Sequence, residues 1–256
     1  MKNWKKNKKA VLGAIVIIAI FFVWFGARTP LAIYEWGKFK AKYFNKFNKG
    51  AVAGLSITKL PVPYHRQEHS LSCEIASLKM ALGYHGISVS ESDLIGFLPF
   101  DATPKSKGVW GDPYKAFVGD INGKMGITGY GVYWEPIAQV GRVWKKTEVL
   151  ENGTPQDLAE HISEGQPIII WGYYGRGKKL SWTTPEGKRI EAINGEHARV
   201  VTGFVGDKTN PEGFVVLDPI YGELFWTTKE LLNNWGAFNN HGVVVYAEDP
   251  VTISAE

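Results

Sequence analysis

The chain has 256 residues, 45% of them hydrophobic and 21% charged, a balance that excludes disordered, collagen-like and low-complexity proteins and fits one folded domain with accessory segments. Its single cysteine excludes an internal disulfide and a multi-cysteine metal cage. The net charge is +4, but the positive charge is concentrated at the amino end: residues 1–9 and 28–49 each carry +5, whereas residues 50–256 carry −6. Because the main part of the chain is acidic, we expect that it does not bind nucleic acid.

The amino-terminal segment predicts a membrane anchor. Residues 10–27 form 18 consecutive uncharged positions, near the minimum length that spans the hydrocarbon core of a bilayer. A cleavable signal peptide is the alternative, but Trp24 or Phe25 would then stand three residues before the cleavage site, where a small residue is required. The five lysines of residues 1–9 favour a cytoplasmic basic tail and a main domain outside the cell membrane.

Residues 28–59 are expected to be a juxtamembrane connector. At helical spacing, the aromatic residues of the stretch 31–49 share one face and its lysines share another. Such a helix suits the headgroup boundary of a membrane, so we expect residues 10–49 to contact lipid. Packing of the aromatic face on the main domain is the alternative.

The main domain is expected to span residues 60–248, with a tail at 249–256. Helical periodicity and capping residues predict helices over residues 72–84, 90–98, 154–164 and 227–235. Apolar runs between turn residues predict strands over residues 167–174, 198–205, 213–217 and 242–247, after an extended stretch at 60–64. Residues 101–145 lack a clear period and are expected to be ordered loop and short strands. Helices that precede an antiparallel sheet predict an α+β fold.

Four residues have the local context of thiol catalysis. Cys73 falls in the first turn of a predicted helix, where free N–H groups and the helix dipole lower the pKa of a thiol, and Gln67 lies in the loop before it, where its amide can donate to an oxyanion. His197 heads a predicted strand and Asp218 ends the next one, so antiparallel pairing would let Asp218 hold the ring of His197. The alternatives are a buried structural cysteine and ordinary turn or loop residues, with His241 as the next candidate base.

The segment from Gln67 to Gly86 resembles the active-site helix of papain-like cysteine peptidases, and most of all that of the double-glycine leader peptidases of bacteriocin exporters. Residues 195–201 and 216–219 resemble the histidine and aspartate blocks of that branch. The resemblance covers roughly residues 60–248 and implies a papain-like fold. The catalytic residues that it implies are the nucleophile Cys73, the base His197, the orienting Asp218 and the oxyanion-hole residue Gln67.

Two features depart from that branch. Glu74 follows the nucleophile where the branch has a glycine, and a carboxylate beside a thiolate raises the pKa of the thiol unless the carboxylate points into solvent. The leader peptidases face the cytoplasm and are fused to a transporter, whereas this chain has one predicted span and a main domain expected outside. Their substrate class is therefore not carried over.

We expect a membrane-anchored, outward-facing thiol hydrolase that cleaves peptide or amide bonds through an acyl-enzyme. A cell-wall peptide amidase or acyl transferase with the same chemistry is one alternative. The other alternative is a surface-binding module that has lost catalytic activity, and Glu74 beside the nucleophile is the feature that would indicate this loss.

No cofactor and no metal are expected. His65, His69 and Cys73 have the spacing of metal ligands on one helix, but Pro61 and Pro63 and the expected loop before residue 72 argue against a continuous helix there. The Gly-rich loop with Asp112, Asp120 and Asn122 could bind calcium, but its spacing matches no standard calcium-binding loop.

Overall fold

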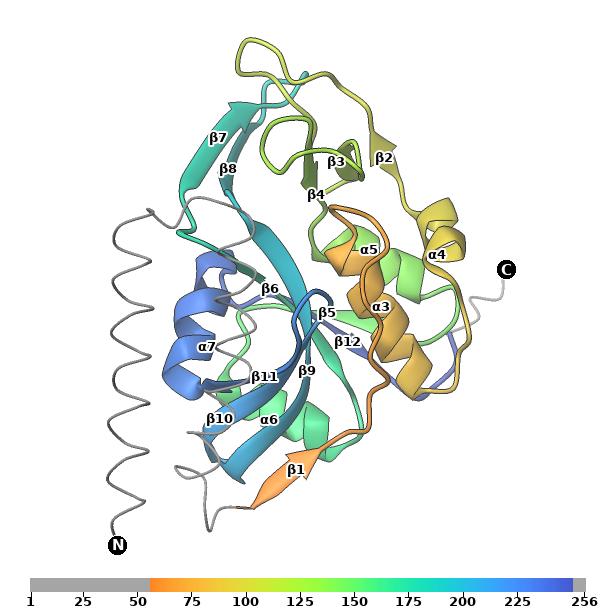
Figure 1. The fold of residues 1–256 in the computed structure, drawn as a ribbon, viewed down its shortest axis with the longest axis vertical. Helices are drawn as coiled ribbons and strands as arrows, with labels where there is room; N and C mark the ends of the chain where they lie inside the picture. The colour runs from red at the N-terminus through yellow and green to blue at the C-terminus, as the bar shows by residue number, and fades with distance from the viewer. Residues whose placement is uncertain (1–55, 251–256) are drawn as a thin grey trace, which may run out of the picture.

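The computed structural model describes residues 56–250, and an antiparallel sheet of seven strands lies at the centre of this part (Figure 1). The strand order is β11-β10-β9-β6-β12-β5, and β1 pairs with β9 beyond the stretch that pairs with β6. The strands are β1 (Ile57–Lys59), β5 (Thr147–Leu150), β6 (Ile168–Tyr173), β9 (Glu196–Asp207), β10 (Asn210–Asp218), β11 (Gly222–Thr227) and β12 (Gly242–Val245).

Helices cover both faces of this sheet. Successive side chains of a strand point to opposite faces, so Ile169 and Trp171 of β6 pack with α3, α4 and α5, whereas Ile168 and Ile170 pack with α6 and α7. The apolar residues therefore form two cores in a three-layer arrangement. The helices are α3 (Cys73–Tyr84), α4 (Glu91–Phe97), α5 (Trp134–Gly141), α6 (Pro155–Ser163), α7 (Thr228–Trp235) and the 3-10 helix η1 (Gly236–Phe238).

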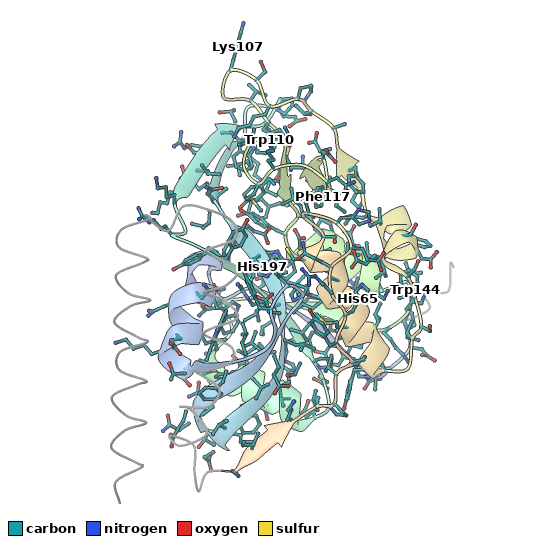
Figure 2. The ribbon with its side chains drawn as sticks, viewed as in Figure 1. His65, Lys107, Trp110, Phe117, Trp144 and His197 are labelled. Carbon is teal, nitrogen blue, oxygen red and sulfur yellow. The ribbon has the colours of Figure 1, made fainter. Side chains whose placement is uncertain are left out.

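Two small sheets lie at one end of the molecule, above the start of α3 in Figure 1. One consists of β2 (Phe100–Asp101), β3 (Phe117–Gly119) and β4 (Gly129–Gly131), and the other is the hairpin of β7 (Lys179–Thr183) and β8 (Arg189–Ile193). Buried aromatic rings join the two sheets: Trp110, labelled in Figure 2, packs against both Tyr130 and Trp182. Tyr130 belongs to β4 and Trp182 to β7, so these contacts hold the two small sheets together.

The structure confirms the antiparallel sheet, the four predicted helices and the four predicted strands, with small differences at their ends. It contradicts the expectation that residues 101–145 hold only loop and short strands, because α5 lies within them. Pro136 stands in the first turn of α5, where proline is tolerated, and Ile137 and Val140 are buried against α3 and the sheet. The strands β5, β7, β8 and β11 were not predicted, since each is short and has several partly exposed residues.

The predicted anchor at residues 10–27, the possible surface helix at 31–49 and the last six residues lie outside the described residues. Among residues 56–250, no helix combines the length and the apolar character that a membrane crossing needs. Strand β1, inside the expected connector, pairs with β9 and is part of the central sheet.

Candidate active site

The start of α3 presents Cys73 to the start of β9. Cys73 is the first residue of α3, only 4% of it is exposed, and α3 packs against β9. The first hydrogen bond of the helix runs from the N–H of Ala76 to the carbonyl of Ser72. The N–H of Cys73 therefore has no acceptor within the helix, and it is placed to donate to a negative oxygen beside the thiol.

Asp218 links His197 to a buried arginine. The hairpin of β9 and β10 brings the first residues of β9 beside the end of β10. Asp218 Oδ2 lies 3.1 Å from His197 Nε2 and 2.7 Å from Arg199 Nε, and all three side chains are buried. Burial alone would raise the pKa of Asp218, but the charges of His197 and Arg199 outweigh it and hold that pKa well below its usual range. Asp218 is thus an ionised acceptor that fixes the orientation of the imidazole ring.

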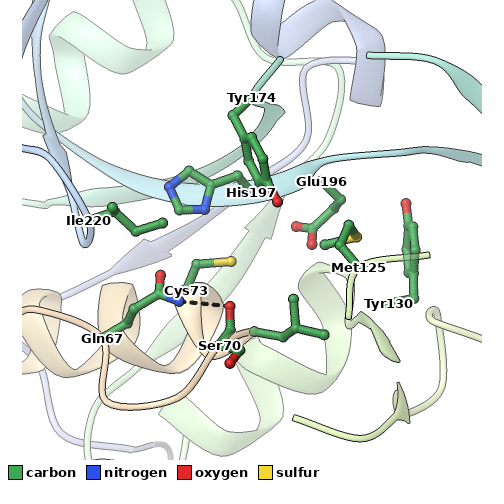
Figure 3. A pocket seen from close by; sticks show the side chains of 10 residues that line it. Gln67, Ser70, Cys73, Met125, Tyr130, Tyr174, Glu196, His197 and Ile220 are labelled. Carbon is green, nitrogen blue, oxygen red and sulfur yellow. Dashed lines mark hydrogen bonds between the residues drawn. The ribbon is translucent and has the colours of Figure 1, made fainter. Parts of the chain in front are cut away.

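Cys73 and His197 face each other across one small pocket (Figure 3). Because Nε2 of His197 is bound to Asp218, Nδ1 is the ring nitrogen that remains to accept a proton. The thiol has other hydrogen-bond partners: Sγ lies 3.2 Å from Glu74 Oε2 and 3.4 Å from the N–H of Ala198. Among the residues that the structure describes, the thiol makes no hydrogen bond to His197, so the thiol must leave Glu74 before its proton can pass to the imidazole.

Gln67 lines the same pocket, but its donors are turned away from the thiol. The amide nitrogen donates to the backbone carbonyls of His69 at 2.8 Å and Ser70 at 3.1 Å. The amide oxygen is buried and has no hydrogen-bond partner among the described residues. A rotation of the side chain would therefore be needed before Gln67 donates to an oxyanion, and its role in an oxyanion hole stays a prediction.

The carboxyl group of Glu74 is buried and points toward the nucleophile. Its Oε1 accepts the N–H of Val132 at 2.8 Å, and its Oε2 contacts Cys73 Sγ. Burial raises the pKa of Glu74 to about 7. Of the two orientations considered from the sequence, the solvent-facing one is therefore wrong.

Glu196 is a residue of the pocket that the sequence interpretation missed. It lines the pocket next to His197, and both of its carboxylate oxygens are buried with no hydrogen-bond partner in the described part of the chain. Burial and the charge of Glu74 raise the pKa of Glu196 well above its usual value. The available signal was an acidic residue at the head of an otherwise apolar strand.

The protonation states differ from the sequence expectation. Burial, followed by the charges of Glu74 and Glu196, raises the pKa of Cys73 well above its usual value. The expectation that the helix start lowers this pKa is therefore wrong, because desolvation and two neighbouring carboxyl groups outweigh the helix dipole. Burial also lowers the pKa of His197 despite the charge of Asp218. The resting pair is consequently a neutral thiol and a neutral imidazole.

The remaining histidines lie in other environments. The segment before α3 is not helical, so His65 and His69 do not form a ladder with Cys73: His65 contacts Glu91, and His69 contacts Asn122. His241 shares a hydrogen bond with the carbonyl of Phe238 and is not among the residues that line the pocket.

Two groups of side chains in the described residues have the donor atoms of a metal site. One consists of His65, Glu68 and Glu91, and the other consists of Cys73, Glu74 and Glu196. In the first group, His65 Nε2 already lies 2.8 Å from Glu91 Oε1, and Glu68 is exposed.

Comparisons with known proteins match residues 59–243 to the model of the Peptidase_C39-like family. The chain is 31% identical over 155 residues to the uncharacterized protein YvpB of Bacillus subtilis (strain 168), and the match covers 59% of this chain and 58% of YvpB. It thus spans less than two thirds of that relative. A crystal structure of a C39-like peptidase from Bacillus anthracis has a TM-score of 0.64 and 24% identity, over 75% of this chain and 98% of that one. A double glycine motif protease from an AMS/PCAT transporter, solved in complex with the leader peptide, has a TM-score of 0.42 and 14% identity, over 73% of this chain and 93% of that one.

Proposed function

Because the chain belongs to the Peptidase_C39-like family and is a cysteine-peptidase-like hydrolase, we propose that it cleaves peptide bonds with Cys73 as nucleophile, His197 as base and Asp218 as the orienting carboxylate. The observation that carries this proposal is the ionised Asp218 on Nε2 of His197, across the pocket from the only cysteine of the chain. The substrate class is a peptide or a protein.

The first chemical step moves one proton and forms one bond. His197 Nδ1 takes the proton of the Cys73 thiol while the sulfur attacks the carbonyl carbon of the scissile bond. The negative oxygen of the tetrahedral intermediate accepts the N–H of Cys73 and, once its amide has turned, a donor of Gln67. The protonated imidazole then gives its proton to the leaving amine, and a thioester remains on Cys73.

The second step returns the enzyme to its resting state. His197 takes a proton from water, the resulting hydroxide attacks the thioester, and Cys73 leaves as a thiolate that recovers the proton from the imidazole. Asp218 and Arg199 remain charged throughout, since their short buried contact compensates both charges. The ring of His197 is thus held in one orientation while its charge changes.

Cleavage of a defined peptide mixture tests this assignment. The full chain should produce new peptide ends that mass spectrometry detects, and Cys73→Ala should produce none while circular dichroism shows an unchanged fold. Since Cys73 is the only cysteine, a peptide-derived electrophile should add one label to the full chain and none to the variant. Equal cleavage by both proteins would exclude Cys73 as the nucleophile, and an absence of both cleavage and labelling would exclude the peptidase function.

We further propose that residues 10–27 anchor the chain in the cell membrane with the catalytic domain outside. The support comes from the uncharged segment and from the five lysines that precede it. Protease added to intact cells should digest the domain, while a cytoplasmic marker protein stays intact. Digestion only after the membrane has been permeabilised would show the opposite orientation.

A further inference from the structure

Three buried donor atoms meet at the side of the pocket next to His197. Cys73 Sγ and one carboxylate oxygen each from Glu74 and Glu196 all lie within 4.8 Å of one another. Cys73 is 4% exposed, and the two glutamates are 1% exposed. The two carboxylates come from residues that directly follow the nucleophile and directly precede the base. The group therefore surrounds the reacting atoms themselves.

Glu196 brings two buried oxygen atoms without a hydrogen-bond partner among the described residues to this group. A buried carboxylate is costly unless a proton, a donor or a cation accompanies it. Figure 3 shows this carboxylate and the Cys73 thiol in the same pocket. An unpartnered acid, aimed at a thiol and a second acid, is the arrangement of an incomplete coordination shell.

The backbone leaves room for both carboxylates. Gly131 at the end of β4 has a φ of +133°, and a Cβ atom there would lie 2.6 Å from Glu74 Oε1 and 2.7 Å from Glu196 Oε2. A side chain at this position would push the two acids apart. The glycine therefore allows them to converge on one point beside Cys73.

We propose that Cys73, Glu74 and Glu196 bind a divalent zinc ion. Thiolate sulfur and carboxylate oxygen are both zinc ligands, and bonds of about 2.0 to 2.3 Å place neighbouring ligand atoms roughly 3.5 Å apart in a tetrahedral site. The separation of 3.2 Å between Cys73 Sγ and Glu74 Oε2 lies close to that spacing. The protons held by the Cys73 thiol and by the two buried carboxyl groups leave to solvent when these residues bind the ion, and a fourth position remains for water.

The bound ion blocks the nucleophile reversibly, a consequence that rests on the function proposed above. With its electron pair on zinc, the sulfur of Cys73 cannot attack a carbonyl group, and removal of the ion restores the thiol. This site departs from the expectation of no metal, which weighed the spacing of His65, His69 and Cys73 and did not consider Glu74 and Glu196 as ligands.

Metal titration of the full chain, after treatment with a chelator, tests the site without any substrate. We expect one equivalent of Zn²⁺ to bind in competition with a chromophoric chelator and to protect Cys73 from iodoacetamide. Co²⁺ in the same site should give a thiolate-to-cobalt charge-transfer band. Glu196→Gln should weaken Zn²⁺ binding by about tenfold or more. The matched control His65→Gln, which disrupts the other candidate group, should bind Zn²⁺ like the parent.

Several results would overturn the site. These are the absence of stoichiometric binding, a cobalt spectrum without the thiolate band, or binding that His65→Gln abolishes and Glu196→Gln leaves unchanged. The cobalt spectrum needs no variant, so a Glu196→Gln protein that fails to fold does not weaken the test. A failure of the proposed function is seen in a separate measurement. In that case the protein binds zinc in the titration, but after removal of the metal it cleaves no peptide.

Discussion

His197→Ala is expected to lower kcat/KM for peptide hydrolysis by about 10²- to 10⁴-fold, because the variant loses the base that takes the thiol proton. The loss should fall mainly on kcat, since the imidazole acts on the reacting atoms rather than on the remote parts of the substrate. Asp218→Asn should cost less, because the ring remains and only its orientation is weakened. Steady-state kinetics on the cleaved peptide, with chelator present, measure both effects.

The matched control is His241→Ala, since His241 stands directly before β12 and was the next candidate base from the sequence. Its activity should stay close to that of the parent. A loss of activity in His241→Ala that His197→Ala does not show would reverse the assignment.

The parent should also show a broad pH optimum of kcat/KM. The lowered pKa of His197 moves the acid side of the profile to lower pH, and the raised pKa of Cys73 moves the alkaline side to higher pH. A narrow optimum would contradict a neutral resting pair.

The positions of Cys73 and His197 are predictable from sequence because each depends on one local signal. The first lies where an apolar period of helical type begins, and the second lies where an apolar strand begins. Their approach to Asp218 needs one more step, the turn at residues 207–210 between β9 and β10. The Asn-Pro-Glu-Gly residues that indicate a turn in the sequence lie at the start of β10, directly beside it. Short-range patterns therefore suffice to bring His197 and Asp218 together.

The orientation of Glu74 depends on distant parts of the chain and is not predictable in this way. Its carboxyl group points inward because it accepts the N–H of Val132, which lies 58 residues further along. That N–H stands just after Gly131, in the region whose sequence has no clear period. Glu196 depends on the same glycine, since a side chain there would exclude its carboxylate.

The environment of Arg199 is likewise not predictable from the local sequence. In the sequence it interrupts an apolar strand, and no neighbouring residue indicates a partner for its charge. The structure buries it because Asp218 accepts its Nε at 2.7 Å and the ring of Trp226 covers its guanidinium group. Both partners come from other strands, so their arrival depends on the register of the finished sheet rather than on a local pattern.

Glu74→Gln is expected to make Cys73 more reactive. The amide oxygen can still accept the N–H of Val132 and the amide nitrogen can still face the sulfur, so the substitution removes a charge and keeps the shape. The charge of Glu74 is the second cause, after burial, of the raised pKa of Cys73. Without that charge the pKa of Cys73 falls, so the thiolate fraction at pH 7 rises and the iodoacetamide rate should rise with it. Mass spectrometry of the metal-free protein follows the single alkylation.

The same variant should be more stable than the parent at high pH. Glu74 has a pKa of about 7 in the folded chain against an ordinary value of 4.5, so the folded state holds its proton more tightly and stability falls as pH rises from 4.5 through 7. In urea unfolding with chelator present, the free energy of unfolding of Glu74→Gln should exceed that of the parent by on the order of 3 kcal/mol at pH 8, and by almost nothing below pH 4.5. Glu160→Gln, on the exposed face of α6, is the control and should show no such pH-dependent gain. A constant difference between Glu74→Gln and the parent from pH 4 to 8 would show that this carboxyl group does not titrate in the folded protein, and that its charge does not suppress the thiol.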